Sequence, residues 1–208
     1  MILNWLPQIV TPAAALLGIA VLSYLIGSIP FGIVITKLFG LGNLREIGSG
    51  NIGATNVLRT GNKLAAFLTL ILDAGKGAIM VIIAHLIFRA GDAAQLAGFA
   101  AFLGHLFPIW LRFSGGKGVA TYLGTLLALS FSVGAAACLT WLAFAALFRF
   151  SSLAALATAV GVLFWLLVFG RSDMMVLMSG LGALVWIRHS ENIKRLLAGT
   201  EPRIGKKS

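Results

Sequence analysis

Long apolar runs alternate with short polar segments along the whole chain, and this pattern predicts a bundle of membrane-spanning helices. Several runs reach the roughly 20 residues that an α-helix needs to cross a bilayer. The polar segments between them are too short to separate two domains. We therefore expect residues 1–208 to form one all-α domain, a polytopic integral membrane protein with seven transmembrane helices. These helices are predicted near residues 13–38, 64–88, 94–111, 118–130, 132–148, 152–169 and 173–188.

The segment 118–148 fits two arrangements, one long helix or a hairpin of two short helices around "SFSVG" at 130–134. A single helix of this length would extend for about 45 Å at 1.5 Å per residue. The charge distribution separates the two arrangements. With seven spans, Arg89 and Arg171 are the two basic residues on one side, and the other 14 of the 16 Lys and Arg residues lie opposite. Six spans would remove this bias, so the positive-inside rule favours the hairpin, with the N-terminus outside and the C-terminus cytoplasmic.

The composition agrees with a membrane protein and excludes several other classes. The chain is 59% hydrophobic and 11% charged, whereas soluble domains have about 45–50% apolar and about 25% charged residues. The net charge of +10 lies mostly in the segments between apolar runs, which does not indicate nucleic-acid binding. Cys138 is the single cysteine, so an intrachain disulfide is excluded. His and Cys do not cluster as metal ligands do, so we expect no metal and no cofactor.

All four polar segments fall on the predicted cytoplasmic side, so residues far apart in sequence can meet there. The first, Arg45 to Lys63, interleaves glycines with hydrogen-bond donors. Small residues let backbone N–H groups approach an anion closely, and an arginine binds phosphate through two parallel hydrogen bonds. This favours an anion site over the alternative of a flexible loop. The donors in this segment are Ser49, Asn51, Thr55, Asn56 and Arg59.

The second polar segment, "FSGGKGVAT" at 113–121, resembles a nucleotide-binding loop but does not match one. In a Walker A loop Ser or Thr follows the lysine, whereas Gly118 follows Lys117 here. We therefore do not predict nucleotide hydrolysis. A glycine-rich turn that opens a helix near Val119 still offers free N–H groups and a positive helix end, which bind anions. Gly115, Gly116, Lys117 and Gly118 are candidate phosphate binders, and the alternative is a lysine that extends to the membrane surface.

The third polar segment, "RFSSL" at 149–153, and the fourth, "WIRHSENIKRL" at 186–196, supply further candidates. Ser152 could contact a ligand, or Ser151 or Ser152 could cap the next helix. His189, Asn192 and Arg195 are spaced three apart, so they share a helix face, although basic residues there also suit an anionic lipid surface.

Two further features lie inside the predicted spans. Asp73 and Lys76 are predicted to form an ion pair, because charges within a membrane are normally paired. His105 either hydrogen-bonds within the bundle or contributes to the site. No histidine has an acidic residue five positions on, so the His/Asp dyad of many glycerolipid acyltransferases is absent.

Four motifs together resemble the bacterial acyl-phosphate:glycerol-3-phosphate acyltransferase family (PlsY). They are "GSIPFG" at 27–32, "GSGNIGATN" at 48–56, "GHLFPIWLRFSGGKGVAT" at 104–121 and "RHSENIKRL" at 188–196. Their order and spacing extend the resemblance over nearly the whole chain. It implies a multi-pass enzyme of the bacterial inner membrane that transfers a fatty acyl group from acyl phosphate to the 1-hydroxyl of glycerol 3-phosphate. The implied products are lysophosphatidic acid and phosphate, with no cofactor and no obligate protein partner.

The resemblance also implies which residues line the substrate site, namely Ser49, Arg59, Lys117, Ser152, His189 and Asn192. Adding the candidates from the polar segments, we expect catalytic roles for Lys117, His189 and Ser49. We expect substrate binding by Asn51, Thr55, Asn56, Arg59, Gly115, Gly116, Gly118, Ser152, Asn192 and Arg195. The general base is either His189 or a phosphate oxygen of the substrate, and the abundance of anion binders favours the substrate. The rival functions are a transporter of a phosphorylated metabolite and a lipid-binding scaffold without catalysis.

Overall fold

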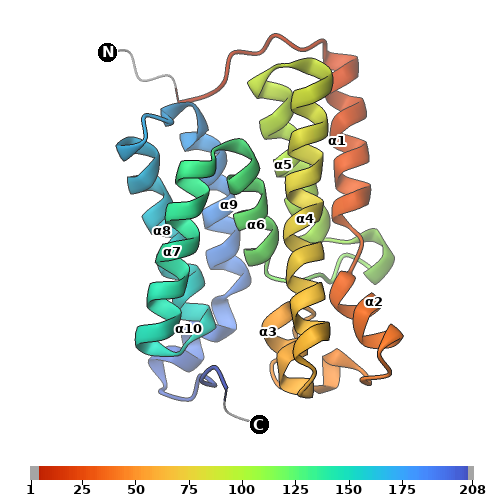
Figure 1. The fold of residues 1–208 in the computed structure, drawn as a ribbon, viewed down its shortest axis with the longest axis vertical. Helices are drawn as coiled ribbons and strands as arrows, with labels where there is room; N and C mark the ends of the chain where they lie inside the picture. Colours follow the sequence, from red (N-terminus) through yellow and green to blue (C-terminus); the bar gives the residue numbers. More distant parts are fainter. Residues whose placement is uncertain (1–4, 206–208) are drawn as a thin grey trace.

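The computed structural model describes residues 5–205, so the two ends of the predicted domain, 1–4 and 206–208, lie outside the described residues. Within residues 5–205 the chain is helical and contains no β-strand. The longer helices stand side by side in a bundle, and the shortest helices lie at one end of it (Figure 1). The helices are α1 (Ala13–Gly27), α2 (Phe31–Leu38), α3 (Ala54–Val57), α4 (Lys63–Phe88), α5 (Gly91–Leu106), α6 (Val119–Leu129), α7 (Phe131–Phe148), α8 (Ser151–Val168), α9 (Met175–Arg188) and α10 (Ser190–Leu197).

Prolines shorten or divide two of the predicted helices. The predicted helix 13–38 is divided, because Pro30 follows α1 and directly precedes α2. Proline lacks an N–H group and disfavours helical geometry in the residue before it. The predicted helix 94–111 is shortened in the same way, since α5 ends at Leu106 and Pro108 separates it from the 3₁₀ turn η3 (Ile109–Leu111).

The hairpin in the segment 118–148 is confirmed. Ser130 lies between α6 and α7 in an extended conformation with φ −157° and ψ 102°, which ends one helix and starts the next. The two helices then pack closely, because a Cβ atom on Gly134 would overlap the backbone of Leu127. One continuous helix over 118–148 is therefore wrong.

Five segments are both long and apolar enough to cross a membrane, namely Ala13–Leu38, Lys63–Phe88, Gly91–Leu111, Phe131–Phe148 and Ser151–Val168. Helices α6, with 11 residues, and α9, with 14, are shorter. The count of seven spans and the orientation of the termini therefore stay predictions. Large apolar side chains cover the outside of the bundle, among them Leu17, Ile87, Leu139 and Phe164, as expected of a surface that faces lipid.

Small residues let the helices of the bundle approach one another closely, as is typical of membrane proteins. A Cβ atom on Gly27 of α1 would overlap the carbonyl of Ala101 on α5, and one on Gly104 would overlap the carbonyl of Tyr24. Helices α1 and α5 therefore meet through their backbones. This contact fixes the end of α5, from which the chain turns into the glycine-rich segment.

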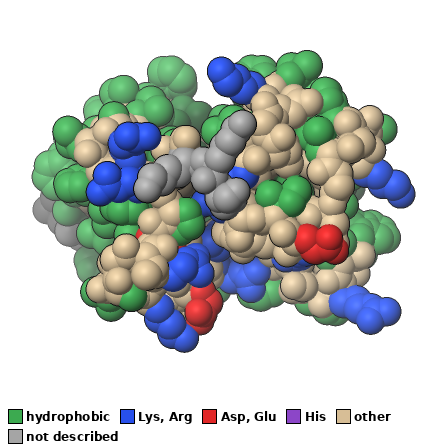
Figure 2. Space-filling view, turned by 90° about the horizontal axis from the view of Figure 1, so that it is seen from below, with side chains coloured by type: hydrophobic (Ala, Val, Ile, Leu, Met, Phe, Trp, Pro, Cys, Tyr) green, Lys and Arg blue, Asp and Glu red, His purple; other side chains and the backbone are tan. Residues whose placement is uncertain are grey.

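The four polar segments meet at one end of the bundle, the lower end in Figure 1, as the sequence predicted. Short helices α2, α3 and α10 lie at this end, and the C-terminal tail returns to it. Figure 2 shows the molecule from this side, with Lys and Arg side chains distributed over the face. The assignment of this end to the cytoplasm stays a prediction.

Candidate active site

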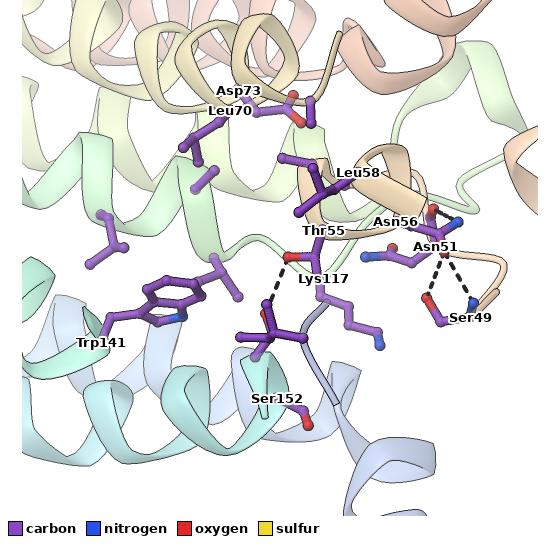
Figure 3. Close-up of a pocket in the computed structure, with 18 of the residues that line it drawn as sticks. Ser49, Asn51, Thr55, Asn56, Leu58, Leu70, Asp73, Lys117, Trp141 and Ser152 are labelled. Atoms are coloured by element: carbon purple, nitrogen blue, oxygen red, sulfur yellow. Dashed lines mark hydrogen bonds between the residues drawn. The ribbon is translucent and has the colours of Figure 1, made fainter. Parts of the chain in front are cut away.

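A cavity of about 880 Å³ opens at this end and is lined by residues from all four polar segments. Its polar part includes Ser49, Asn51, Thr55, Arg59, Lys117, Ser152, His189 and Asn192. Figure 3 shows the Lys117 side chain extending into the space between Ser152 and the first polar segment. Residues as far apart in sequence as Ser49 and Asn192 therefore share one site, as the sequence predicted.

Asn56 organises the first polar segment from inside. Its side chain is 1% exposed, and its amide nitrogen donates to three loop carbonyls at 2.8–3.0 Å. Its Oδ1 accepts hydrogen bonds from the backbone N–H of Ser49 and from Nη1 of Arg59, each at 3.1 Å. Because its polar atoms are used within the protein, Asn56 holds Ser49 and Arg59 in place.

Arg59 presents a half-buried positive charge to the cavity. Burial lowers the pKa of Arg59 from its usual value, while the carboxylate of Glu201 raises it and Arg195 lowers it. An arginine remains protonated throughout the physiological range. Its guanidinium therefore supplies a permanent cation with donors in excess of the single bond to Asn56.

Gly115 and Gly116 do not line the cavity. Their N–H groups donate to the carbonyls of Leu106 and His105, each at 3.1 Å, so these two donors are already used. A Cβ atom on Gly116 would overlap the imidazole of His105. The two glycines therefore fit the loop tightly against the end of α5, a role different from the predicted contact with substrate.

Lys117 and Gly118 do line the cavity, at the start of α6. Gly118 has φ +85° and lies against the ring of Phe102, so a side chain there would be strained and would also collide. Burial lowers the pKa of Lys117 from 10.5 to about 8. The ammonium and the first N–H groups of α6 together form a positive corner that suits an anion.

His189 follows α9 and is 3% exposed. Its Nδ1 lies 2.8 Å from the carbonyl oxygen of Val185. A carbonyl only accepts, so Nδ1 carries the hydrogen and Nε2 keeps its lone pair. Burial lowers the pKa of His189 to about 4, and the imidazole is therefore neutral at pH 7.

Glu201, in the tail after α10, is a site residue that the sequence analysis missed. Its Oε1 accepts hydrogen bonds from Ser152 Oγ and Asn192 Nδ2, each at 2.6 Å, and its Oε2 accepts from Arg195 Nε at 2.7 Å. Lys117 in turn donates to Oδ1 of Asn192. Burial alone would raise the pKa of Glu201, but these hydrogen bonds lower it below 4.5. A signal was available, because the chain has only six acidic residues.

The serines at the start of α8 do not cap it, since the residue before the helix is Phe150 and no side chain there bonds its N–H groups. Ser152 instead contacts Glu201. Ser151 lies 3.2 Å from the hydroxyl of Thr55. The third polar segment thus contacts the first and the tail that follows the fourth, and the ligand role predicted for Ser152 stays a prediction.

The intramembrane ion pair is confirmed, because Nζ of Lys76 lies 2.9 Å from Oδ1 of Asp73. Nδ1 of His105 lies 3.5 Å from the same oxygen. All three side chains are buried, and Lys76 also donates to the carbonyl of Ile29 at 2.9 Å. Asp73 and His105 also line the cavity. A contribution of His105 to the site therefore stays a prediction, and within residues 5–205 its Nδ1 makes no hydrogen bond.

An apolar arm extends from the cavity between α4, α6 and α7, lined by Phe67, Leu70, Leu123, Leu127, Trp141 and Leu142. Phe67 is 57% exposed and Leu142 is 56% exposed. Both therefore belong to the cavity wall and to the apolar outer surface. The arm connects the polar site with the region that faces lipid.

A scan against protein families matches residues 17–199 to the glycerol-3-phosphate acyltransferase family. The chain belongs to this family. Curated glycerol-3-phosphate acyltransferases agree over almost the full length. The protein of Cereibacter sphaeroides is 61% identical, covering 98% of this chain and 96% of its own. That of Dinoroseobacter shibae is 59% identical, covering 97% and 99%.

Solved structures of this acyltransferase family resemble the fold. The crystal structure of PlsY, an integral membrane glycerol 3-phosphate acyltransferase, in its glycerol 3-phosphate form matches with a TM-score of 0.86. It is 41% identical and covers 91% of this chain and 96% of its own. The lysophosphatidic acid form matches with a TM-score of 0.82 and 39% identity, covering 91% and 95%. This similarity and the apolar helices identify an integral membrane protein.

In this family member the structure brings nearly all the predicted site residues to one cavity. Three of them lie outside its lining, Gly115, Gly116 and Arg195. The glycines pack behind Lys117, and Arg195 reaches the site through Glu201. The catalytic and binding roles of the others stay predictions, supported by their shared position.

Proposed function

We propose that the protein transfers a fatty acyl group from acyl phosphate to the 1-hydroxyl of glycerol 3-phosphate, with seven spans and a site facing the cytoplasm of a bacterial inner membrane. The observation that carries this is one cavity with a cationic polar end and an apolar arm open to the membrane surface. The apolar arm suits the fatty acyl chain of the donor. The cationic end suits the phosphate groups of the donor and of the water-soluble acceptor. The names of the relatives support the acceptor, and the four sequence motifs support the donor.

The polar end suits two phosphate groups. Arg59 and Lys117 reach it from the first and second polar segments, and the start of α6 adds N–H groups. In the reaction the acceptor hydroxyl oxygen attacks the acyl carbonyl carbon. The bond from that carbon to the bridging phosphate oxygen then breaks, and the electron pair leaves with phosphate. Lys117 stabilises this departing charge, as preorganised donors do at developing oxyanions.

The proton of the attacking hydroxyl goes to a phosphate oxygen of the substrate. A pKa of about 4 makes the His189 imidazole a weak base at pH 7, and efficient general bases have a pKa near the working pH. Nε2 of His189 is available to accept a hydrogen bond from the glycerol backbone, because Nδ1 is held by Val185. His189 therefore orients the acceptor.

The pH–rate profile of His189→Gln tests this assignment with saturating substrates. Glutamine can still accept a hydrogen bond but cannot take up the proton. We expect a large fraction of kcat to remain. A loss of many orders of magnitude would assign the base to His189 and reject substrate assistance.

The overall activity is tested by incubating the purified protein in detergent with a long-chain acyl phosphate and radiolabelled glycerol 3-phosphate. We expect labelled lysophosphatidic acid and one released phosphate per product, with no product from the corresponding acyl-CoA. Turnover with acyl-CoA alone would contradict the proposed donor. Absence of turnover together with uptake of label into proteoliposomes would show a transporter instead.

A further inference from the structure

Two arginines lie behind the glycine-rich loop, on the side away from the cavity. Arg188, the last residue of α9, donates from Nη2 to the carbonyl of Gly115 at 3.0 Å and from Nε to that of Gly116 at 3.1 Å. Arg45, in the 3₁₀ turn η1 (Leu44–Glu46), donates to the carbonyl of Ser114. Three successive carbonyls of the loop are thus held by guanidinium groups.

The opposite face of the loop is hydrogen-bonded to the end of α5. The N–H groups of Gly115 and Gly116 donate to the carbonyls of Leu106 and His105. A Cβ atom on Gly115 would overlap these carbonyls, and one on Gly116 would overlap the His105 ring. The loop is therefore fitted between α5 and Arg188.

This arrangement determines which backbone groups face the cavity. A trans peptide bond is planar, so its C=O and N–H point in opposite directions. Because the Gly116 carbonyl points to Arg188, the N–H of Lys117 points away from Arg188. Carbonyl oxygens that pointed into the cavity would repel a bound phosphate. Here the guanidinium groups bind these carbonyl oxygens on the side away from the cavity.

We propose that Arg188 is a positioning residue for the phosphate-binding loop, acting through the Gly115 and Gly116 carbonyls on Lys117. This rests on the proposed function, since it assumes that Lys117 binds a substrate phosphate. Arg188 does not line the cavity, so it does not itself contact substrate. The guanidinium carbon lies 5.8 Å from the centroid of the Phe107 ring, which fixes the plane of the donor fork. Lysine cannot reproduce a two-donor fork of this kind.

The kinetic test compares Arg188→Met and Arg188→Lys with Arg112→Met. Arg112 directly precedes the glycine-rich loop, is exposed, and makes no side-chain hydrogen bond within residues 5–205. Its replacement is therefore a matched control for the loss of one positive charge near the loop. For Arg188→Met we expect kcat to fall about 10- to 100-fold, less than after removal of Lys117 itself, because two charge-assisted hydrogen bonds that hold the loop are lost. We expect a much smaller change in either KM, partial recovery in Arg188→Lys, and wild-type values in Arg112→Met.

Hydrogen exchange supplies a readout that does not depend on activity. In Arg188→Met we expect faster amide exchange confined to residues 113–118, with unchanged exchange in α4 and α8. In Arg188→Ala we expect added methylguanidinium to restore part of the lost activity, which a variant with a collapsed fold would not show.

The proposal is overturned if Arg188→Met leaves kcat and the exchange of the loop unchanged, or if Arg112→Met reproduces its effects. It is also overturned if Arg188→Lys is fully active, because charge alone would then suffice. If the wild-type protein makes no lysophosphatidic acid, the proposed function fails. The exchange measurement then still decides whether Arg188 holds the loop.

Discussion

The two ends of the bundle each bury a carboxylate, and the two carboxylates bind different kinds of partner. At the end with short connections, Asp92 at the start of α5 accepts from the N–H groups of Val10 and Thr11, each at 2.8 Å, and from the Thr11 hydroxyl at 2.9 Å. At the cavity end, Glu201 accepts from the side chains of Ser152, Asn192 and Arg195. Asp92 therefore holds a backbone segment in place, whereas Glu201 positions side chains at the cavity.

This difference separates stability from function in the molecule. Within residues 5–12, before α1, no residue belongs to a hydrophobic core cluster, and Asp92 attaches this segment to α5 by accepting from two of its backbone N–H groups. Glu201 contacts three side chains that come from two of the polar segments. A carboxylate that binds backbone N–H groups is expected to affect folding alone. One that binds site residues is expected to affect catalysis as well.

The largest effect is expected at Lys117, which Asn192 connects to Glu201. Lys117→Ala removes the ammonium that stabilises the departing phosphate. We expect kcat to fall about 10²- to 10³-fold, the loss typical of removing one oxyanion donor. Steady-state kinetics with the purified protein measure it, and an unchanged melting temperature is the control. Near-normal turnover would contradict the anion corner at α6.

Glu201→Gln is expected to produce the next largest effect. The amide can accept only through one oxygen, so at least one of the bonds to Ser152, Asn192 and Arg195 is lost. We expect kcat/KM to fall about 10- to 100-fold, in line with about 1.5–3 kcal/mol for a charge-assisted hydrogen bond.

The double variant Glu201→Gln with Asn192→Ala gives the control for this effect. If Glu201 acts through Asn192, the two losses will not add, because coupled residues show an interaction energy in a double-mutant cycle. Strictly additive losses would show that Glu201 acts independently of Asn192.

Asp92→Asn provides the contrasting case at the other end. The NH2 group of asparagine replaces either Oδ2, which accepts from Val10 and Thr11, or Oδ1, which accepts from the N–H of Ala93. In both orientations a buried backbone donor loses its acceptor. We expect the protein to lose about 1–3 kcal/mol of stability, which corresponds to a melting temperature lower by several degrees for a chain of this size. Kinetic constants should match wild type. A selective loss of activity without loss of stability would remove the distinction between the two carboxylates.

The sequence predicted the helices and the place of the site better than the contacts of individual site residues. Charge bias identified the α6–α7 hairpin, and proline positions explain where α1 and α5 end. Glycine-rich patterns identified Lys117, because free N–H groups beside a lysine have a chemical meaning that does not depend on the fold. The same patterns assigned Gly115 and Gly116 to substrate, since a sequence does not show whether a loop N–H faces a cavity or a helix end.

Asn56, Arg188 and Glu201 illustrate what the sequence pattern leaves open. Asn56 and Arg188 lie at the ends of motifs and Glu201 lies beyond one, and the partners of all three are determined by folding. Ser152 and Glu201 are 49 residues apart, and Arg188 and Gly116 are 72 apart. Loop conformation decides whether such a side chain binds substrate or holds a neighbour that does, and no local periodicity encodes that choice.

The smallest expected effect is a shift in the pH dependence of activity. The pKa of Lys117 is lowered from 10.5 to about 8 by burial, Glu201 opposes this change, and the arginines Arg195, Arg59 and Arg188 add to it. A lowered lysine pKa means that the ammonium is lost at lower pH than in a free lysine. If the ammonium is required, kcat/KM will fall as pH rises through about 8. Substrate phosphates, with a second pKa near about 6, are already ionised there.

Glu201→Gln removes the charge that raises the pKa of Lys117, so the alkaline limb of kcat/KM is expected to move to lower pH. Asp92→Asn lies at the opposite end of the bundle and is expected to leave the limb in place. The profiles of the three proteins, recorded between pH 6 and 10 at constant ionic strength, measure this directly. An alkaline limb that moves equally in both variants would show that the shift reports general loosening of the fold. A limb that moves only in Glu201→Gln would tie the carboxylate to the charge state of Lys117, the functional connection that Asp92 lacks.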